Sequence, residues 1–155
     1  MNPRVDLIAA SLLALDEHPA DVLVLTAFAD ERPLPGLAGL VDWRLNGRLS
    51  DWMLGGFATG QTHEKVLCPT QGRLPQPLVL IIGLGLKSQH RADRARSVAI
   101  EAACTVRDLG KRTMACGLFG LDRLPTPVER SLPELIQTLK TQAELEAITL
   151  SVPEQ

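Results

Sequence analysis

Two glycine-bearing segments hold the residues best suited to chemistry in this chain of 155 residues. In IIGLGLKS, Gly83 and Gly85 follow an apolar run, and GLFGLDRLPTP begins with the tetrad Gly117-Leu118-Phe119-Gly120 just before an expected helix. Glycine allows a ligand to approach the backbone closely, and free amides near a helix start attract anions. Each segment is therefore a candidate phosphate-binding loop, and a structural turn is the alternative for each.

The first segment lacks the remainder of either common nucleotide-binding pattern. A dinucleotide fingerprint needs a third glycine where this sequence has Ser88, and a P-loop needs Gly-Lys-Ser/Thr after four intervening residues. These absences favour a tight turn at Gly83 and Gly85, at the point where a strand leaves its sheet.

The histidine, serine and cysteine residues form no recognisable catalytic or metal-binding motif. His63-Glu64 begins like a zinc-protease helix, but Leu67 stands where the second histidine would be. No serine lies in a G-x-S-x-G elbow. The cysteines are widely spaced among apolar residues, which predicts buried thiols rather than disulfides or a zinc site: Cys68, Cys104 and Cys116. We assign no catalytic residue, no metal ligand and no cofactor.

The composition is that of a soluble globular protein, with 45% hydrophobic residues, 22% charged residues and a formal net charge of −2. This length suits one domain, and we expect a single domain over residues 1–155. The negative charge and the 3% share of aromatic residues argue against nucleic-acid binding. No apolar run approaches the roughly 20 residues that span a bilayer, and Leu7–Leu15 lacks the flanks of a signal peptide. We therefore expect no membrane association and a cytoplasmic location.

Short apolar runs alternate with longer segments of helical period, which is the pattern of an α/β domain with a mixed, largely parallel sheet. The run LVLII is apolar at every position, which predicts a central strand buried on both faces. Strands are expected at Val5–Ala10, Val22–Phe28, Lys65–Cys68, Leu78–Ile82, Thr113–Phe119 and Ala147–Val152.

Three helical segments are expected between these strands. Leu37–Leu54 has helical spacing as one helix or two, and Arg91–Leu109 has a continuous apolar stripe that ends before a glycine. The last helix runs to about Glu144, with capping-box starts at Thr126 and Ser131, of which Pro133 favours the later.

The segment from Ala20 to Gly110 resembles the amino-terminal domain of the leucyl aminopeptidase (cytosol aminopeptidase) family. The resemblance rests on ADVLVLTAF, on GLAGLVDWRLNGRLSDWMLGGFATGQ, and on the pair KVLCPT and LVLIIGLG. In that family a carboxy-terminal domain binds two divalent metals within motifs resembling G-K-G-x-x-F-D-S-G-G and N-T-D-A-E-G-R. Neither motif occurs in this sequence. The resemblance therefore implies no peptidase activity for this chain.

That amino-terminal domain is related in fold to macro domains, which bind ADP-ribose. The resemblance implies a three-layer, macro-domain-like α/β fold whose mixed, largely parallel central sheet is flanked by helices. The tetrad at Gly117 is similar to the macro-domain diphosphate loop, which lies at a comparable strand-to-helix junction. Two parts of the pattern are missing: Thr26-Ala27-Phe28 stands where a macro domain supplies an asparagine, and Leu34–Gly39 lacks its run of glycines.

Two functions are compatible with the sequence. The first is a non-catalytic interaction, oligomerisation or regulatory module that binds its own copies or a full-length aminopeptidase, and the missing asparagine and glycines favour it. The second is a macro-domain-type binder or hydrolase of ADP-ribose or another nucleotide or phosphate ligand.

A ligand of this second kind would bind Gly83, Gly85, Gly117, Leu118, Phe119 and Gly120. Its site would lie where three loops meet: Thr26–Arg32, Gly83–Lys87 and Gly117–Arg123. A bulky residue in place of Gly120 should then abolish binding and leave the fold largely intact.

Overall fold

A six-stranded sheet forms the middle layer of the protein, in the strand order β1-β6-β5-β2-β4-β3. The structure is a computed structural model, and it describes residues 2–153. Five neighbouring strands run parallel, while β3 pairs antiparallel with β4 at one edge. The strands are β1 (Arg4–Ala9), β2 (Val22–Phe28), β3 (Lys65–Pro69), β4 (Leu78–Gly85), β5 (Thr113–Cys116) and β6 (Ala147–Val152).

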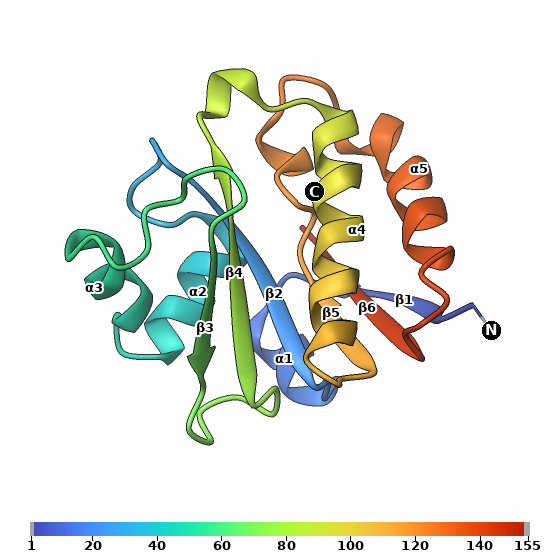
Figure 1. Ribbon diagram of the computed structural model, residues 1–155, viewed down its shortest axis with the longest axis horizontal. Coiled ribbons are helices and arrows are strands. Elements are labelled where there is room, and N and C mark those ends of the chain that lie inside the picture. The colour runs from blue at the N-terminus through green and yellow to red at the C-terminus, as the bar shows by residue number, and fades with distance from the viewer. Residues whose placement is uncertain (1, 154–155) are drawn as a thin grey trace.

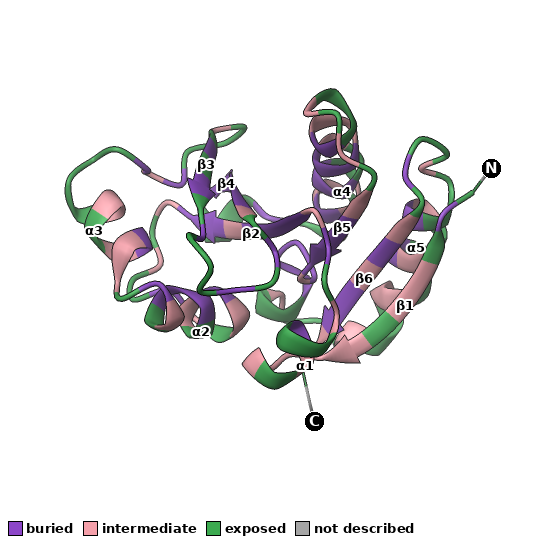
Figure 2. Ribbon diagram, turned by 90° about the horizontal axis from the view of Figure 1, so that it is seen from below, coloured by how far each residue is buried: buried purple, intermediate pink, exposed green. Residues whose placement is uncertain are grey.

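Helices cover both faces of the sheet, as Figures 1 and 2 show. On one face lie α4 (Ala92–Asp108) and α5 (Val128–Lys140), and on the other lie α1 (Leu12–Glu17), α2 (Gly36–Arg44) and α3 (Arg48–Leu54). Two 3-10 turns, η1 (Lys87–Gln89) and η2 (Leu121–Arg123), complete the fold. A separate hydrophobic cluster fills the space between the sheet and each helical layer. The predicted three-layer α/β fold is confirmed.

Strand β4 is buried on both faces, as its uniformly apolar sequence predicts. Leu80 and Ile82 pack toward α4, whereas Val79 and Ile81 belong to the cluster under α2. The strand continues to Gly85 instead of ending at Ile82, so the turn predicted at Gly83 and Gly85 is wrong. The strand is extended because its last residues pair with the end of β2. The Gly60–Thr62 segment also approaches closely, and a Cβ on Gly83 would collide with the backbone oxygen of Gln61.

The segment Leu37–Leu54 forms two helices, one of the alternatives that its sequence leaves open. The chain breaks at Gly47, whose positive φ of 77° starts α3. The buried carboxylate of Asp42 caps α3 by accepting hydrogen bonds from the amides of Leu49 (2.8 Å) and Ser50 (3.1 Å). Helix α1 is absent from the sequence predictions, and its short first turn is capped by Ser11, which accepts from the Ala14 amide at 3.1 Å.

Three predicted boundaries are wrong in the carboxyl-terminal third. Strand β5 ends at Cys116, so Gly117–Phe119 lies in a loop. Helix α5 begins at Val128 after Pro127, earlier than Pro133 suggests, and ends at Lys140, with neither capping box formed. Pro133 removes one backbone hydrogen bond, but the buried apolar stripe of Leu135 and Leu139 anchors the helix against the sheet.

Candidate ligand site at the carboxyl ends of the strands

A crevice opens where adjacent parallel strands send their chains to opposite faces of the sheet. Strand β2 continues to α2 on one face, and its neighbour β5 continues to α5 on the other. Such a switch point leaves a gap beyond the carboxyl ends of the strands, where ligands of open α/β sheets bind. A cavity of about 70 Å³ lies there, between Thr26–Phe28, the first turn of α2 and Gly117–Gly120.

A larger cavity of about 340 Å³ adjoins the first one and shares Leu37, Gly117, Leu118 and Asp122 with it. Its remaining wall includes Ser11, which follows β1, and Ser151 in β6. The Ser151 side chain is 2% exposed, and its hydroxyl has no hydrogen-bond partner within residues 2–153. A buried hydroxyl without a partner costs about 1–3 kcal/mol, so a polar ligand group at this wall would be stabilised.

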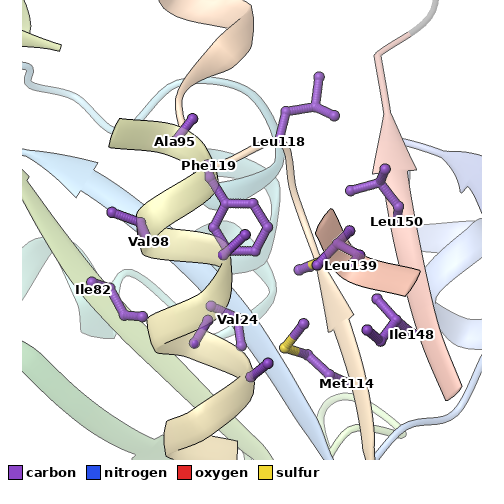
Figure 3. Close-up of a cluster of buried hydrophobic side chains, with 14 of the residues drawn as sticks. Val24, Ile82, Ala95, Val98, Met114, Leu118, Phe119, Leu139, Ile148 and Leu150 are labelled. Carbon is purple, nitrogen blue, oxygen red and sulfur yellow. The ribbon is translucent and has the colours of Figure 1, made fainter. Parts of the chain in front are cut away.

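The loop Gly117–Gly120 lines the smaller cavity. Phe119 has a positive φ of 56°, and its fully buried ring anchors the loop in the core beside Val98 and Leu118 (Figure 3). Within residues 2–153, the amides of Leu118, Phe119 and Gly120 donate no hydrogen bond. These unpaired N–H groups are donors available to an anion.

The start of α2 lies across the cavity from this loop. Its N-cap residue is Pro35, which supplies no side-chain cap, so the first amides of the helix keep their free N–H groups. Residues from Pro35 to Ala38 line the two cavities. Because a helix start carries partial positive charge, the two sets of amides together favour a negatively charged group.

The side chain of His90 contacts the Gly117–Gly120 loop from the protein interior. Its side chain is buried, its Nε2 lies 3.0 Å from the Phe119 carbonyl, and its ring meets Phe28 edge-on with 5.2 Å between centroids. Burial lowers the pKa of His90, which keeps the ring neutral at pH 7 with Nε2–H donating to Phe119. The Nδ1 atom has no partner within residues 2–153.

Gly120 packs directly against this histidine. Its φ is 88°, and a Cβ there would lie 2.7 Å from Nε2 of His90 and 3.0 Å from Leu84. The expectation that a bulky residue at Gly120 leaves the fold intact is therefore wrong, because the position has neither the space nor the backbone conformation for a side chain.

A charged network closes the outer side of the smaller cavity. Glu31, in the loop after β2, accepts from Lys87 Nζ at 2.8 Å and from Arg123 Nη2 at 2.5 Å. The neighbouring Asp30 accepts from the Lys87 amide at 3.0 Å. These contacts bring together the three loops that the sequence predicts to meet.

The two carboxyls at the cavity have pKa values shifted in opposite directions. Burial raises the pKa of Glu31, but hydrogen bonds and charge from Arg123 and Lys87 outweigh burial and hold it below its usual range. Asp122 is exposed by surface area, yet protein crowds its carboxyl on the cavity side. This burial raises the pKa of Asp122, and Arg123 offsets only part of the effect.

Solved structures with this arrangement of strands and helices are macrodomains and aminopeptidases. The macrodomain of Mycobacterium tuberculosis DarG superposes with a TM-score of 0.70 at 13% identity, over 97% of this chain and 99% of that chain. A Trypanosoma brucei macrodomain in complex with ADP-ribose gives a TM-score of 0.65 at 19% identity, over 95% of this chain and 63% of that chain. This chain has a macrodomain fold.

The likeness to aminopeptidases is found in both structure and sequence. A tomato leucine aminopeptidase variant superposes on this chain with a TM-score of 0.68 at 17% identity, over 97% of this chain and 32% of that chain. A probable cytosol aminopeptidase of Geotalea uraniireducens is 31% identical over 103 residues, which are 64% of this chain and 20% of the aminopeptidase. No model of a known protein family matches the sequence. The chain thus resembles the amino-terminal region of leucyl aminopeptidases, and it spans about one fifth of the length of that curated relative.

The macrodomain fold separates the glycines singled out from the sequence into two groups. Residues Gly117–Gly120 all line the smaller cavity. Gly83 and Gly85 lie within β4, face the Gly60–Thr62 segment and line neither of the two cavities. Sequence reasoning missed Ser11 and Ser151, and it included Glu31 and Asp122 only as members of the converging loops Thr26–Arg32 and Gly117–Arg123. A polar residue directly after a predicted strand was the available signal for Ser11.

Across residues 2–153, no group of three or more His, Cys, Asp and Glu side chains is arranged to hold a metal ion. In the same range, no helix is both long and apolar enough to cross a bilayer. Cys68 and Cys116 are buried as predicted, but Cys104 is partly exposed because it lies at the margin of the apolar stripe of α4, so the prediction is wrong for this thiol.

Proposed function

We propose that this chain is a non-catalytic binding module that takes a phosphate-containing small molecule of the ADP-ribose class in the two adjoining cavities. One observation carries the proposal: the loop with the unpaired amides of Leu118, Phe119 and Gly120 and the uncapped start of α2 line one cavity at the switch point of the sheet. The macrodomain from Trypanosoma brucei, which shares the fold, was solved with ADP-ribose, and this supports the choice of ligand class.

The two cavities offer different chemistry to the two parts of such a ligand. The smaller one supplies backbone N–H donors on both sides, which suit phosphate oxygens. The larger one combines the apolar side chains of Leu37 and Leu40 with the hydroxyls of Ser11 and Ser151 and the Asp122 carboxyl. Apolar walls with a few polar groups suit a nucleoside, whose ring stacks on hydrocarbon while its hydroxyls form hydrogen bonds.

The binding function is proposed without a hydrolytic step. The backbone at Thr26-Ala27-Phe28 offers no asparagine side chain at the end of β2, and the loop before α2 has no run of glycines. The cavity residues from β2 are mostly apolar, so none of them is suited to activate a water molecule.

Titration calorimetry tests this function with ADP-ribose, ADP, AMP and adenosine as a ligand series. We expect submillimolar binding of the phosphate-bearing compounds and weaker binding of adenosine, which has no group for the amide donors. Ser151→Ala should weaken ADP-ribose binding by roughly threefold to tenfold, since it removes one buried hydrogen bond. Ser97→Ala, at an exposed position on α4, is the matched control. No heat with any of the four compounds at millimolar concentration would exclude the proposal.

A second candidate function, protein interaction, is favoured by an exposed apolar surface around α2 and α3. Leu54 is 87% exposed, Trp43 is 74% exposed and Phe57 is 65% exposed, although large apolar side chains are normally buried. Large apolar patches on a protein surface mark sites of protein association. Sedimentation of the chain, alone and with a cytosol aminopeptidase, tests this function. The interaction function would be contradicted if the chain sediments as a monomer, if added aminopeptidase leaves its sedimentation unchanged, and if Trp43→Ser also leaves it unchanged.

A further inference from the structure

The carboxylate of Glu31 is unusual among the charged groups of the protein because it is both deeply buried and doubly paired. Its side chain is 10% exposed, whereas those of its partners Lys87 and Arg123 are about 40% exposed. Arg123 also places Nε at 3.2 Å from Oε2 and 3.3 Å from Oε1 of Glu31. The least exposed member of this charged network is thus the negative one, Glu31, and it forms ion pairs with both Lys87 and Arg123.

Glu31 holds its carboxylate at the smaller cavity, which has a volume of about 70 Å³. Glu31 and Arg123 line this cavity beside the Gly117–Gly120 amides. A phosphate bound to those amides would meet the carboxylate at short range, and like charges at short range repel.

We propose that Glu31 is an internal competitor for the anionic group of the ligand, and that binding exchanges the Glu31 carboxylate for a ligand phosphate on Arg123 and Lys87. This inference rests on the proposed function. The guanidinium of Arg123 already engages one carboxylate through Nε and Nη2, the same two-point geometry that it offers to phosphate. When Glu31 swings outward, the cavity enlarges and two cations become available to join the amide donors.

The exchange makes the site selective for ligands with enough charge to displace a carboxylate. A neutral or weakly charged molecule gains nothing from Arg123 and Lys87 while Glu31 holds them. The protein thereby keeps both cations paired with Glu31 until a ligand with higher affinity for the exchanged arrangement binds.

Calorimetric titration of pyrophosphate and of ADP-ribose into four proteins tests the exchange: the unmodified chain, Glu31→Gln, Arg123→Gln and the double variant. Glutamine keeps the size and one acceptor oxygen of Glu31 but removes its charge. We expect Glu31→Gln to bind both probes about tenfold more tightly, and we expect Arg123→Gln to remove most of that gain in the double variant. Asp16→Asn, which breaks the surface pair with Arg44, has the same change in net charge and should leave both affinities unchanged.

The outcomes separate this inference from the function on which it rests. Binding by the unmodified chain with equal or weaker binding by Glu31→Gln would overturn the exchange alone and assign Glu31 to loop structure. Absence of binding by both proteins would overturn the exchange and the proposed function together. Melting temperatures establish that the variants fold, and Glu31→Ala, which also frees both cations, replaces Glu31→Gln if that protein does not fold.

Discussion

Replacing Gly120 with alanine tests how tightly His90 and the Gly117–Gly120 loop are packed. Gly110 provides a matched control because both glycines have a left-handed backbone, with φ of 88° and 77°. A Cβ on Gly110 would meet no atom within 4 Å, while a Cβ on Gly120 would lie 2.7 Å from His90 Nε2. The pair therefore differs in available space and shares the same backbone strain.

The expected losses of unfolding free energy follow from these two contributions. The left-handed conformation costs an alanine about 1–2 kcal/mol at either position. Forcing an extra methyl group into a filled core adds about 1–3 kcal/mol, and this applies only at Gly120. The entropy that alanine removes from the unfolded chain is the same at both sites. We expect Gly110→Ala to cost about 1–2 kcal/mol and Gly120→Ala to cost about 2–5 kcal/mol.

Urea unfolding followed by tryptophan fluorescence measures both variants, because the unfolding midpoint and slope give the free energy. Equal losses for the two variants would refute the reasoning, since they would show that the His90 side chain yields freely. A loss at Gly110 larger than that at Gly120 would contradict the packing described around the loop.

Three other outcomes are expected. Burial lowers the pKa of His90 below 6.5, so the unfolded chain binds a proton at His90 more readily than the folded protein does. The unfolding free energy should therefore fall as the pH drops below about 6.5. A His90→Gln variant with the same dependence of unfolding free energy on pH would contradict this. Cys104 should react with a thiol reagent faster than Cys68 and Cys116, and a fast phase that persists in Cys104→Ser would assign the exposed thiol elsewhere. The chain should release no amino acid from aminoacyl substrates with added zinc or manganese; metal-dependent turnover that survives repurification would overturn this expectation.

Local patterns in the sequence were sufficient to predict most of the sheet. Strand β4 is recognisable because burial on both faces requires an uninterrupted apolar run, and Leu78–Ile82 supplies one. Its true end at Gly85 depends on pairing with Phe28 and on the approach of the Gly60–Thr62 segment, neither of which leaves a mark in the local sequence. The local sequence is therefore enough to identify the strand, whereas its end depends on long-range pairing and cannot be predicted locally.

The candidate site was predictable where its residues are consecutive and where loops follow parallel strands. Gly117–Gly120 is visible as a spacing of glycines, and the structure places all four residues at one cavity. Ser11 and Ser151 come from opposite ends of the chain and share a wall only because β1 pairs with β6.

The pairing of β1 with β6 has a consequence for how the chain is made. Arg4 in β1 lies opposite Ala147 in β6, so β1 is synthesised long before the strand with which it pairs. At 5–20 residues per second the delay is roughly 7–28 s, during which β1 and the open edge of β5 carry unpaired backbone. A newborn chain in this state exposes an edge on which other chains can aggregate. Loss of β6 by early termination would leave that edge open permanently, and such a product should be recognised by chaperones and proteases rather than accumulate as a shorter native protein.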